Sequence, residues 1–164
     1  MRVVVADATP LHYLILIDAI DVLPRLFERI HVPVEVRDEL ICEATPPRVR
    51  SWLQKPPEWL EVLGAAVAAS EDAVLAALDL GERAAIVLAE SIHADLLLID
   101  DRAGAILAQR RGLAVTGTLG ISDLASQAGL LHLQDAFQRL QKTNFRYPPS
   151  LLESLLKEER NRKK

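Results

Sequence analysis

The chain has 164 residues and a formal net charge of −4, and half of its residues are hydrophobic although only 4% are aromatic. This size is typical of one domain spanning residues 1–164, and the single cysteine, Cys42, excludes an internal disulfide or a zinc site with several cysteine ligands. The acidic balance argues against a protein that coats nucleic acid by neutralising phosphates, but it is compatible with an enzyme that approaches phosphates through bound cations.

The N-terminal segment predicts a buried strand followed by a helix. Residues 2–6 form a short apolar run rich in β-branched side chains, and the run ends at Asp7. Such a run is typical of a strand buried on both faces of a parallel sheet. Thr9 followed by Pro10 predicts a hydroxyl-capped helix that continues to about Leu16. Charged residues interrupt the apolar stretch, so we expect no signal peptide, no membrane span and a cytoplasmic location.

The remaining segments alternate between helical and strand patterns. Helices are expected at residues 21–28, 33–44, 48–55, 71–78, 82–93, 102–111, 119–127, 131–142 and 150–159, and strands at 30–32, 59–63, 95–99 and 113–115. Gly81 is expected to break the chain, and the C-terminal helix and basic tail, about 148–164, to fray at the end. This alternation predicts an α/β fold, a three-layer sandwich with helices flanking a central parallel sheet. Ligands in such folds bind beyond the carboxyl ends of the strands.

Two of the expected strands end directly in aspartate. Asp7 follows the first strand, and Asp100 and Asp101 follow a later one. A structural role is open at both places, because Asp7 could satisfy loop amides beside Thr9 and one aspartate could cap the helix that follows. One cap leaves the other aspartate unexplained. Asp100 is the better candidate ligand because it comes straight off the strand, and Asp101 could replace or assist it in holding a hard cation.

Two glutamates on expected helices are further candidates, although each has an ordinary structural explanation. Glu82 lies in a first turn just after Gly81, where an acid complements the helix dipole. Glu39 lies beside an apolar stripe marked by Val36 and Leu40, where it could belong to a solvated acidic face. Together the acids match the chemistry of phosphodiester hydrolysis, because Mg²⁺ or Mn²⁺ takes oxygen ligands and activates water.

Five motifs, in this order and spacing, resemble the PIN domain family. They are VVADATPLHYL, VPVEVRDEL, GERAAIVLA, ADLLLIDDRAG and GLAVTGTLGISDLASQAG, and the resemblance extends from Val3 to about Leu156. More narrowly, the chain resembles the prokaryotic branch related to VapC-type toxin ribonucleases. The resemblance implies a parallel sheet and a cluster of acidic residues that binds Mg²⁺ or Mn²⁺ and supports cleavage of RNA.

The resemblance also implies roles for individual residues. The catalytic acids are matched by Asp7, Glu39, Glu82 and Asp100, and the metal ligands by Asp7, Glu82, Asp100 and Asp101. Thr9 matches a hydroxyl residue that positions water or ligand. Arg102 is not part of this match, and it is the preferred contact to an RNA phosphate because it stands beside the acids. Two positions depart from the family pattern, since Glu82 replaces the usual aspartate and Ile99 stands where a threonine is common.

Two functional hypotheses follow. The first is a metal-dependent endoribonuclease, the toxin of a toxin–antitoxin pair, with an RNA substrate, a cognate antitoxin and a homodimeric assembly away from membranes. The second, motivated by the departures at Glu82 and Ile99, is a catalytically weak or inactive PIN-fold module that binds RNA or protein. A phosphatase is less favoured, because Thr9 stands where such an enzyme needs its second aspartate.

Other residues have open roles. A dimer face could be formed by a set of apolar residues that could equally belong to the core, Leu11, Leu14, Leu23, Leu26 and Phe27. Arg83, Arg110, Arg111 and the basic tail could contact RNA phosphates or simply face solvent. His12 is the histidine nearest the expected site, but no histidine has a metal-ligand spacing.

Overall fold

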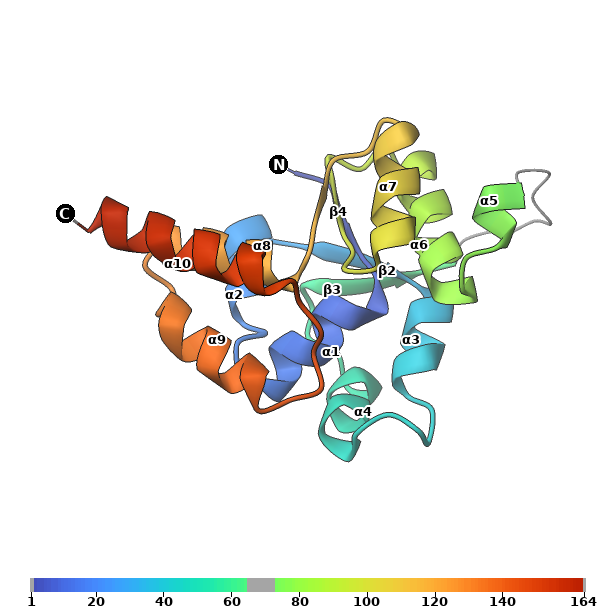
Figure 1. The fold of residues 1–164 in the computed structure, drawn as a ribbon. Coiled ribbons are helices and arrows are strands. Elements are labelled where there is room, and N and C mark those ends of the chain that lie inside the picture. The colour runs from blue at the N-terminus through green and yellow to red at the C-terminus, as the bar shows by residue number, and fades with distance from the viewer. Residues whose placement is uncertain (1, 65–72, 164) are drawn as a thin grey trace.

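The protein folds around a central parallel sheet (Figure 1). The computed structural model describes residues 2–64 and 73–163, and within them five strands pair in the order β3-β2-β1-β4-β5. Every pairing is parallel. The strands are β1 (Val4–Ala6), β2 (Ile30–Pro33), β3 (Leu60–Leu63), β4 (Leu96–Leu98) and β5 (Val115–Thr116).

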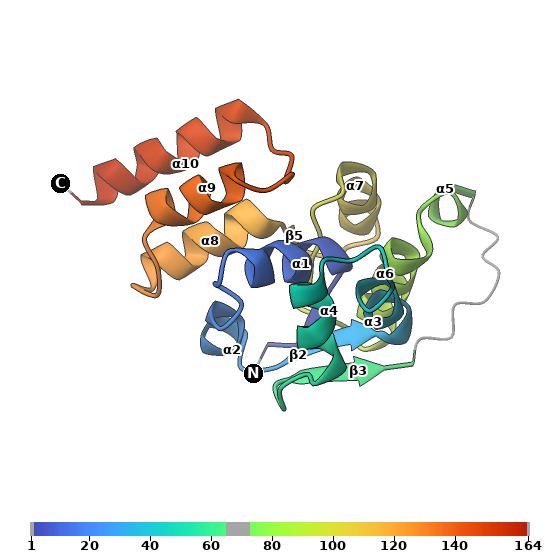
Figure 2. The same cartoon turned by 90° about the horizontal axis from the view of Figure 1, so that it is seen from below.

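Helices occupy most of the chain between and after the strands. Those in the described residues are α1 (Ala8–Leu16), α2 (Val22–Phe27), α3 (Val34–Leu40), α4 (Pro47–Gln54), α5 (Ala73–Ala76), α6 (Leu80–Ser91), α7 (Arg102–Arg110), α8 (Thr118–Gln127), α9 (Leu133–Gln141) and α10 (Pro149–Arg162). None of them is both long enough and apolar enough to span a bilayer. Figure 2 shows α8, α9 and α10 stacked side by side, away from α5. The sheet with flanking helices confirms the predicted α/β sandwich.

Separate apolar clusters pack against the two faces of the sheet. On β1, Val4 and Ala6 belong to a cluster built with α1, α2, α8 and α9, whereas Val5 between them belongs to a cluster built with α6 and α7. On β4, Leu98 and Leu97 divide in the same way. Successive strand side chains point to opposite faces, so a continuous apolar run is needed to fill both clusters. This explains why the sequence shows no polar alternation in these strands.

The strand order creates a crevice at the carboxyl ends of β1 and β4. The chain moves outward from β1 to β2 and β3, and then returns to place β4 and β5 on the other side of β1. The connections therefore leave β1 and β4 in opposite directions, which is where ligands bind in open α/β sheets. The backbone N–H of Asp7 donates to the carbonyl of Leu98 at 2.8 Å, so the two aspartate-bearing strand ends are adjacent.

Three expected boundaries are wrong. Helix α1 begins at Ala8, so Asp7 and not Thr9 occupies the N-cap position. Gly81 does not break the chain, because it lies in the first turn of α6. The helix expected at 33–44 ends at Leu40. Of the helix expected at 71–78, residues 71 and 72 lie outside the described residues, and α5 covers only Ala73–Ala76.

The basic tail is helical and paired, contrary to the expected fraying. Helix α10 continues to Arg162, whose guanidinium donates to Asp123 Oδ1 on α8 at 2.9 Å. Lys163 lies 3.4 Å from Glu159, a buried acid that also accepts a 2.7 Å hydrogen bond from Ser126. Lys164 lies outside the described residues. These contacts hold the end of α10 against α8.

The apolar set considered for a dimer face belongs to the core. Leu11, Leu14 and Leu23 have no exposed surface and Phe27 is 3% exposed, while Leu26 packs against the same cluster. The homodimer therefore stays a prediction that these residues do not support.

Candidate active site

Asp7 is a buried carboxylate at the end of β1. It is only 3% exposed, and its Oδ1 atom has no hydrogen-bond partner although it is buried. A buried carboxylate oxygen without a partner is energetically unfavourable, because burial removes its hydrogen bonds to water and no protein donor replaces them. Burial, assisted by the negative charges of Glu82, Glu39 and Asp100, raises the pKa of Asp7 to about 7, against a lowering contribution from the backbone N–H of Ala8. The site therefore holds Asp7 in an environment that disfavours its charge.

Asp100 is held in place by the turn that follows β5. The backbone N–H of Thr118 donates to Oδ1 at 2.8 Å, and the Thr118 hydroxyl donates to Oδ2 at 2.6 Å. A Cβ atom on Gly117 would lie 2.5 Å from Oδ1, so this turn can approach the carboxylate only because Gly117 has no side chain. Burial raises the pKa of Asp100, whereas the two hydrogen bonds from Thr118 lower it. Asp100 is therefore a carboxylate of fixed orientation.

Asp101, and not Asp100, caps the helix that follows β4. Its Oδ2 accepts a 2.8 Å hydrogen bond from the backbone N–H of Gly104 and caps α7. Asp100 therefore does not cap α7, which leaves its carboxylate available as a ligand. Asp101 nevertheless remains beside the acids, because its charge raises the pKa of Glu82.

Glu39 and Glu82 come from two helices that meet at Gly81. A Cβ atom on Gly81 would lie 2.6 Å from Glu39 Oε2 and 3.8 Å from Asp7 Oδ1, so the missing side chain makes room for both carboxylates. Burial raises the pKa of Glu82 to about 7, with further contributions from Asp101 and Asp79. Burial also raises the pKa of Glu39, followed by the charge of Asp79. The four acids therefore interact electrostatically across β1, α3, α6 and β4.

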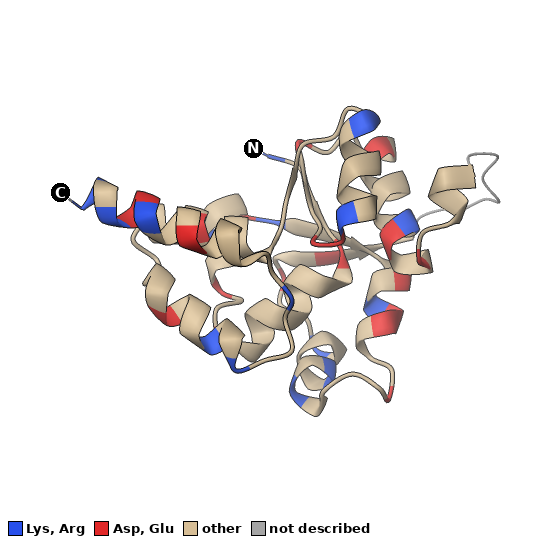
Figure 3. Ribbon diagram, in the orientation of Figure 1, with Lys and Arg blue, Asp and Glu red and all other residues tan. Residues whose placement is uncertain are grey.

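Glu82, Asp100 and Asp101 line a hollow of about 410 Å³, here called the acidic hollow, whereas Asp7 is buried and does not line it. It is lined by Thr9, Tyr13, Glu82, Asp100, Asp101, Asn144, Phe145 and Arg146. Thr9 lines this hollow, whereas Arg102 lines an adjoining hollow and Glu39 lines a third one that also contains Thr9. Figure 3 shows acidic positions at the starts of α6 and α7, with basic positions on α7 and on the segment leading to α10.

The donor set suits a hard divalent cation. Carboxylate oxygens are the ligands that Mg²⁺ and Mn²⁺ take, and a cation would relieve both the unpartnered Asp7 oxygen and the mutual repulsion of the acids. Across residues 2–64 and 73–163, however, no three His, Cys, Asp or Glu side chains are gathered closely enough to enclose an ion.

Four residues of this site were missed from the sequence. Asp79, before α6, acts on the pKa of both glutamates, but nothing distinguished it from a surface acid. Thr118 belongs to the GTLG stretch, whose role could not be seen without the pairing of β4 and β5. Asn144 accepts a 2.7 Å hydrogen bond from the Tyr13 hydroxyl across 131 positions of sequence, and Arg146 lies close by. No local sequence signal predicts such a contact.

Replacing Gly81 by alanine is expected to weaken metal binding without destabilising the fold. In Gly81→Ala the new methyl group is expected to displace the flexible end of Glu39. Because Glu39 would then no longer support a neighbouring cation site, metal affinity is expected to fall about 10-fold. Stability is expected to stay equal or rise, because alanine is favoured over glycine in helices by about 1 kcal/mol. Metal titration and thermal melting measure the two effects. Gly64→Ala is the matched control, since a Cβ there meets nothing within 4 Å, and equal metal affinity in both variants would refute the prediction.

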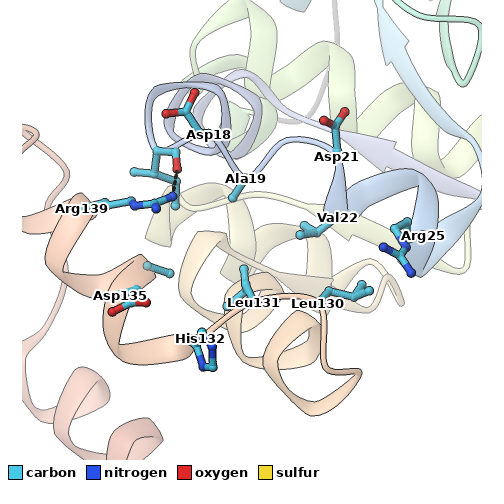
Figure 4. A pocket seen from close by; sticks show the side chains of 12 residues that line it. Asp18, Ala19, Asp21, Val22, Arg25, Leu130, Leu131, His132, Asp135 and Arg139 are labelled. Carbon is cyan, nitrogen blue, oxygen red and sulfur yellow. Dashed lines mark hydrogen bonds between the residues drawn. The ribbon is translucent and has the colours of Figure 1, made fainter.

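Another hollow, of about 320 Å³, lies far from the acids, between the end of α1, α2 and the turn before α9. Figure 4 shows the charged side chains around it, including Asp18, Asp21, Asp135 and Arg139. Arg139 donates a 3.0 Å hydrogen bond to the carbonyl of Ile17, and Asp18 pairs with Arg48. These contacts tie α9 and α4 to the end of α1, so the charges of Arg139 and Asp18 have a structural explanation.

One comparison with known proteins assigns the chain to a family. Residues 3–161 match a family model described as a PIN domain. No curated protein matches the chain.

Proposed function

Because the chain belongs to the PIN domain family, whose members are generally nucleases that use divalent metals, we propose that it is an endoribonuclease dependent on Mg²⁺ or Mn²⁺. The residues proposed to hold the cation are Asp7, Glu82 and Asp100, assisted by Asp101, with Glu39 as the further catalytic acid. The observation that supports this most is the buried, unpartnered oxygen of Asp7 among other acids at the crevice between β1 and β4. The family match gives no support to the phosphatase alternative.

Each residue contributes a distinct physical property to the proposed reaction. When bound, a divalent cation lowers the pKa of a water molecule and offsets the charge that develops on the phosphate. Thr118 keeps the Asp100 carboxylate in one orientation through its two hydrogen bonds. Gly81 and Gly117 let Glu39 and Asp100 approach without steric conflict. The raised pKa of Glu82 allows this side chain to hold or release a proton near neutral pH.

The remaining polar residues are proposed to position the substrate. Thr9 presents a hydroxyl to the acidic hollow, and Tyr13 is fixed there by its bond to Asn144. Arg146 lines the same hollow and is exposed, so its guanidinium can meet a phosphate oxygen. Arg102 can do the same from the start of α7, where it is also exposed.

The finer biological role is part of the proposal. The VapC-like resemblance favours a cytoplasmic toxin that forms a homodimer and is silenced by a cognate antitoxin covering the acidic hollow. A basic antitoxin side chain would fit among the acids, because their repulsion already raises the pKa of Asp7 and Glu82. A short neighbouring gene for a DNA-binding protein, whose product binds this chain and suppresses cleavage, is the expected observation.

A catalytically weak or inactive PIN-fold module is the second candidate. It is favoured by the finding that, within the described chain, no three candidate ligands already enclose an ion-sized space. Glu82 in place of the family's usual aspartate and Ile99 in place of its common threonine also favour this candidate. This candidate predicts RNA or protein binding without metal-dependent turnover.

A panel of labelled RNAs tests the proposed activity. The panel includes unstructured oligonucleotides, hairpins and total RNA, incubated with Mg²⁺, Mn²⁺ or EDTA. Cleavage is expected with either cation, none in EDTA, and recovery when the cation is restored in excess. Absence of cation-dependent cleavage on the whole panel would favour the inactive module.

A further inference from the structure

A second hollow adjoins the acidic one and has a different chemical character. Its volume is about 530 Å³, within the range of roughly 300–1,000 Å³ that small-molecule sites in proteins occupy. It lies between the start of α7, strand β5 and the segment that leads into α10. Its walls are mainly apolar, so it is named the apolar hollow; the residues that line it include Ile99, Ala105, Val115, Leu119, Tyr147 and Leu151.

The two hollows are neighbours that share part of their lining. Asp100, Phe145 and Arg146 line both of them. The Phe145 ring packs edge-on against Tyr13 at 4.9 Å on the acidic side and stacks on Tyr147 at 6.2 Å with an interplanar angle of 24° on the apolar side. A row of aromatic rings therefore leads from the acids into the apolar hollow.

Two unpaired cations flank the apolar hollow. Arg102 at the start of α7 and Arg146 before α10 both line it and are exposed. In the part of the chain that the structure describes, neither guanidinium takes part in an ion pair or a hydrogen bond, whereas Arg111 pairs with Glu90 and Arg162 with Asp123. A guanidinium left free at the rim of an apolar hollow is suited to a ligand that combines an anionic group with a flat apolar one.

We infer that the apolar hollow is a nucleoside subsite for single-stranded RNA. The inference rests on the proposed function, because the phosphate to be cleaved lies among the acids and fixes where the strand continues. One base packs against Tyr147 and the apolar walls, while Arg102 and Arg146 hold the phosphates on either side of that nucleotide.

The observations favour a single strand over a duplex or a protein segment. A base within a duplex is stacked and paired on its inner edges, so it cannot enter a hollow in the protein without being extruded. A purely apolar protein segment would leave the two guanidinium groups unpaired. A nucleotide satisfies both the aromatic row and the positive rim, and base stacking on an aromatic ring contributes about 1–3 kcal/mol.

The test measures binding in EDTA, where no cation-dependent cleavage occurs. A short oligoribonucleotide containing 2-aminopurine is titrated with the protein, and its fluorescence reports stacking. We expect quenching with the single strand and none with the matched blunt duplex. Tyr147→Leu keeps an apolar side chain but removes the ring, and is expected to weaken binding by about 5- to 100-fold and to abolish quenching. Tyr147→Phe should retain both signals.

Charge variants complete the experiment. Arg102→Gln and Arg146→Gln are expected to weaken binding and its salt dependence, whereas Arg110→Gln, at the other end of α7, should not. Thermal melting verifies that each variant is folded. Equal affinity for single strand and duplex, or unchanged binding by Tyr147→Leu, would overturn the inference. A protein segment would then be the favoured occupant of the apolar hollow. Intact binding without cleavage in Mg²⁺ or Mn²⁺ would instead reject only the proposed enzyme activity.

Discussion

Asp7→Asn is expected to lower RNA cleavage by at least about 100-fold. The variant keeps the shape of the side chain but removes the charge at the most buried acid of the site, which is 3% exposed. A ligand that contributes about 3 kcal/mol to charge stabilisation corresponds to a loss of this size. Initial rates on the best RNA of the panel, measured in saturating Mn²⁺, provide the comparison.

A nearby surface acid supplies the control for this loss. Asp38 is exposed on α3, one position before Glu39, and its Oδ1 is bonded only to Arg37 among the described side chains. Asp38→Asn removes the same charge from the same region and is expected to retain wild-type cleavage. If Asp7→Asn also retained it, Asp7 would have a structural role and the proposed cation site would lie elsewhere.

Metal-free protein is expected to lose stability as the pH rises from about 5 to 8. The pKa of Asp7 in the folded protein is about 7, above its ordinary value of 3.8, and the pKa of Glu82 is also about 7, above its ordinary value of 4.5. The folded state therefore binds more protons than the unfolded state in this interval, so the free energy of unfolding falls until both acids are ionised. For Asp7 the effect is on the order of 3 kcal/mol, or roughly 6–12 °C in melting temperature.

Asp7→Asn isolates this contribution from other titrations. His12 acts in the opposite direction, because burial lowers its pKa and its folded form prefers to be neutral. Comparing the pH dependence of melting between wild type and Asp7→Asn cancels His12, and the variant should show the smaller decrease. Mn²⁺ should restore stability to the wild type most strongly near pH 8, where protons compete least. Parallel melting curves for the two proteins would contradict the assignment.

The strand-borne acids were predictable from the sequence, whereas the helix-borne acids were not. Asp7 and Asp100 follow apolar runs, and parallel strands bring their carboxyl ends to one edge. Glu39 and Glu82 looked like ordinary helix residues, and only the family resemblance singled them out. Their approach depends on α3 packing against α6 at Gly81, which is a contact between distant segments.

The rest of the site depends on long-range packing that local patterns do not encode. Gly81 was interpreted as a chain break because glycine is unfavourable in helices, but the close approach of Glu39 outweighs that preference. The basic tail was expected to fray because most termini do, but Asp123 and Glu159 pair with it. Arg146 lies near the acids because the segment after α9 lines the same hollow as Thr9 and Tyr13 of α1.

Isothermal titration of Mn²⁺ into metal-free protein at about pH 7.5 tests most directly whether these acids form a cation site. Saturable binding below millimolar concentration is expected, together with proton release that makes the heat depend on the buffer, because Asp7 and Glu82 are partly protonated at this pH. Asp7→Asn should lose this binding and Asp38→Asn should keep it. No binding by the wild type at millimolar Mn²⁺, or equal binding by Asp7→Asn, would contradict a cation site built on Asp7.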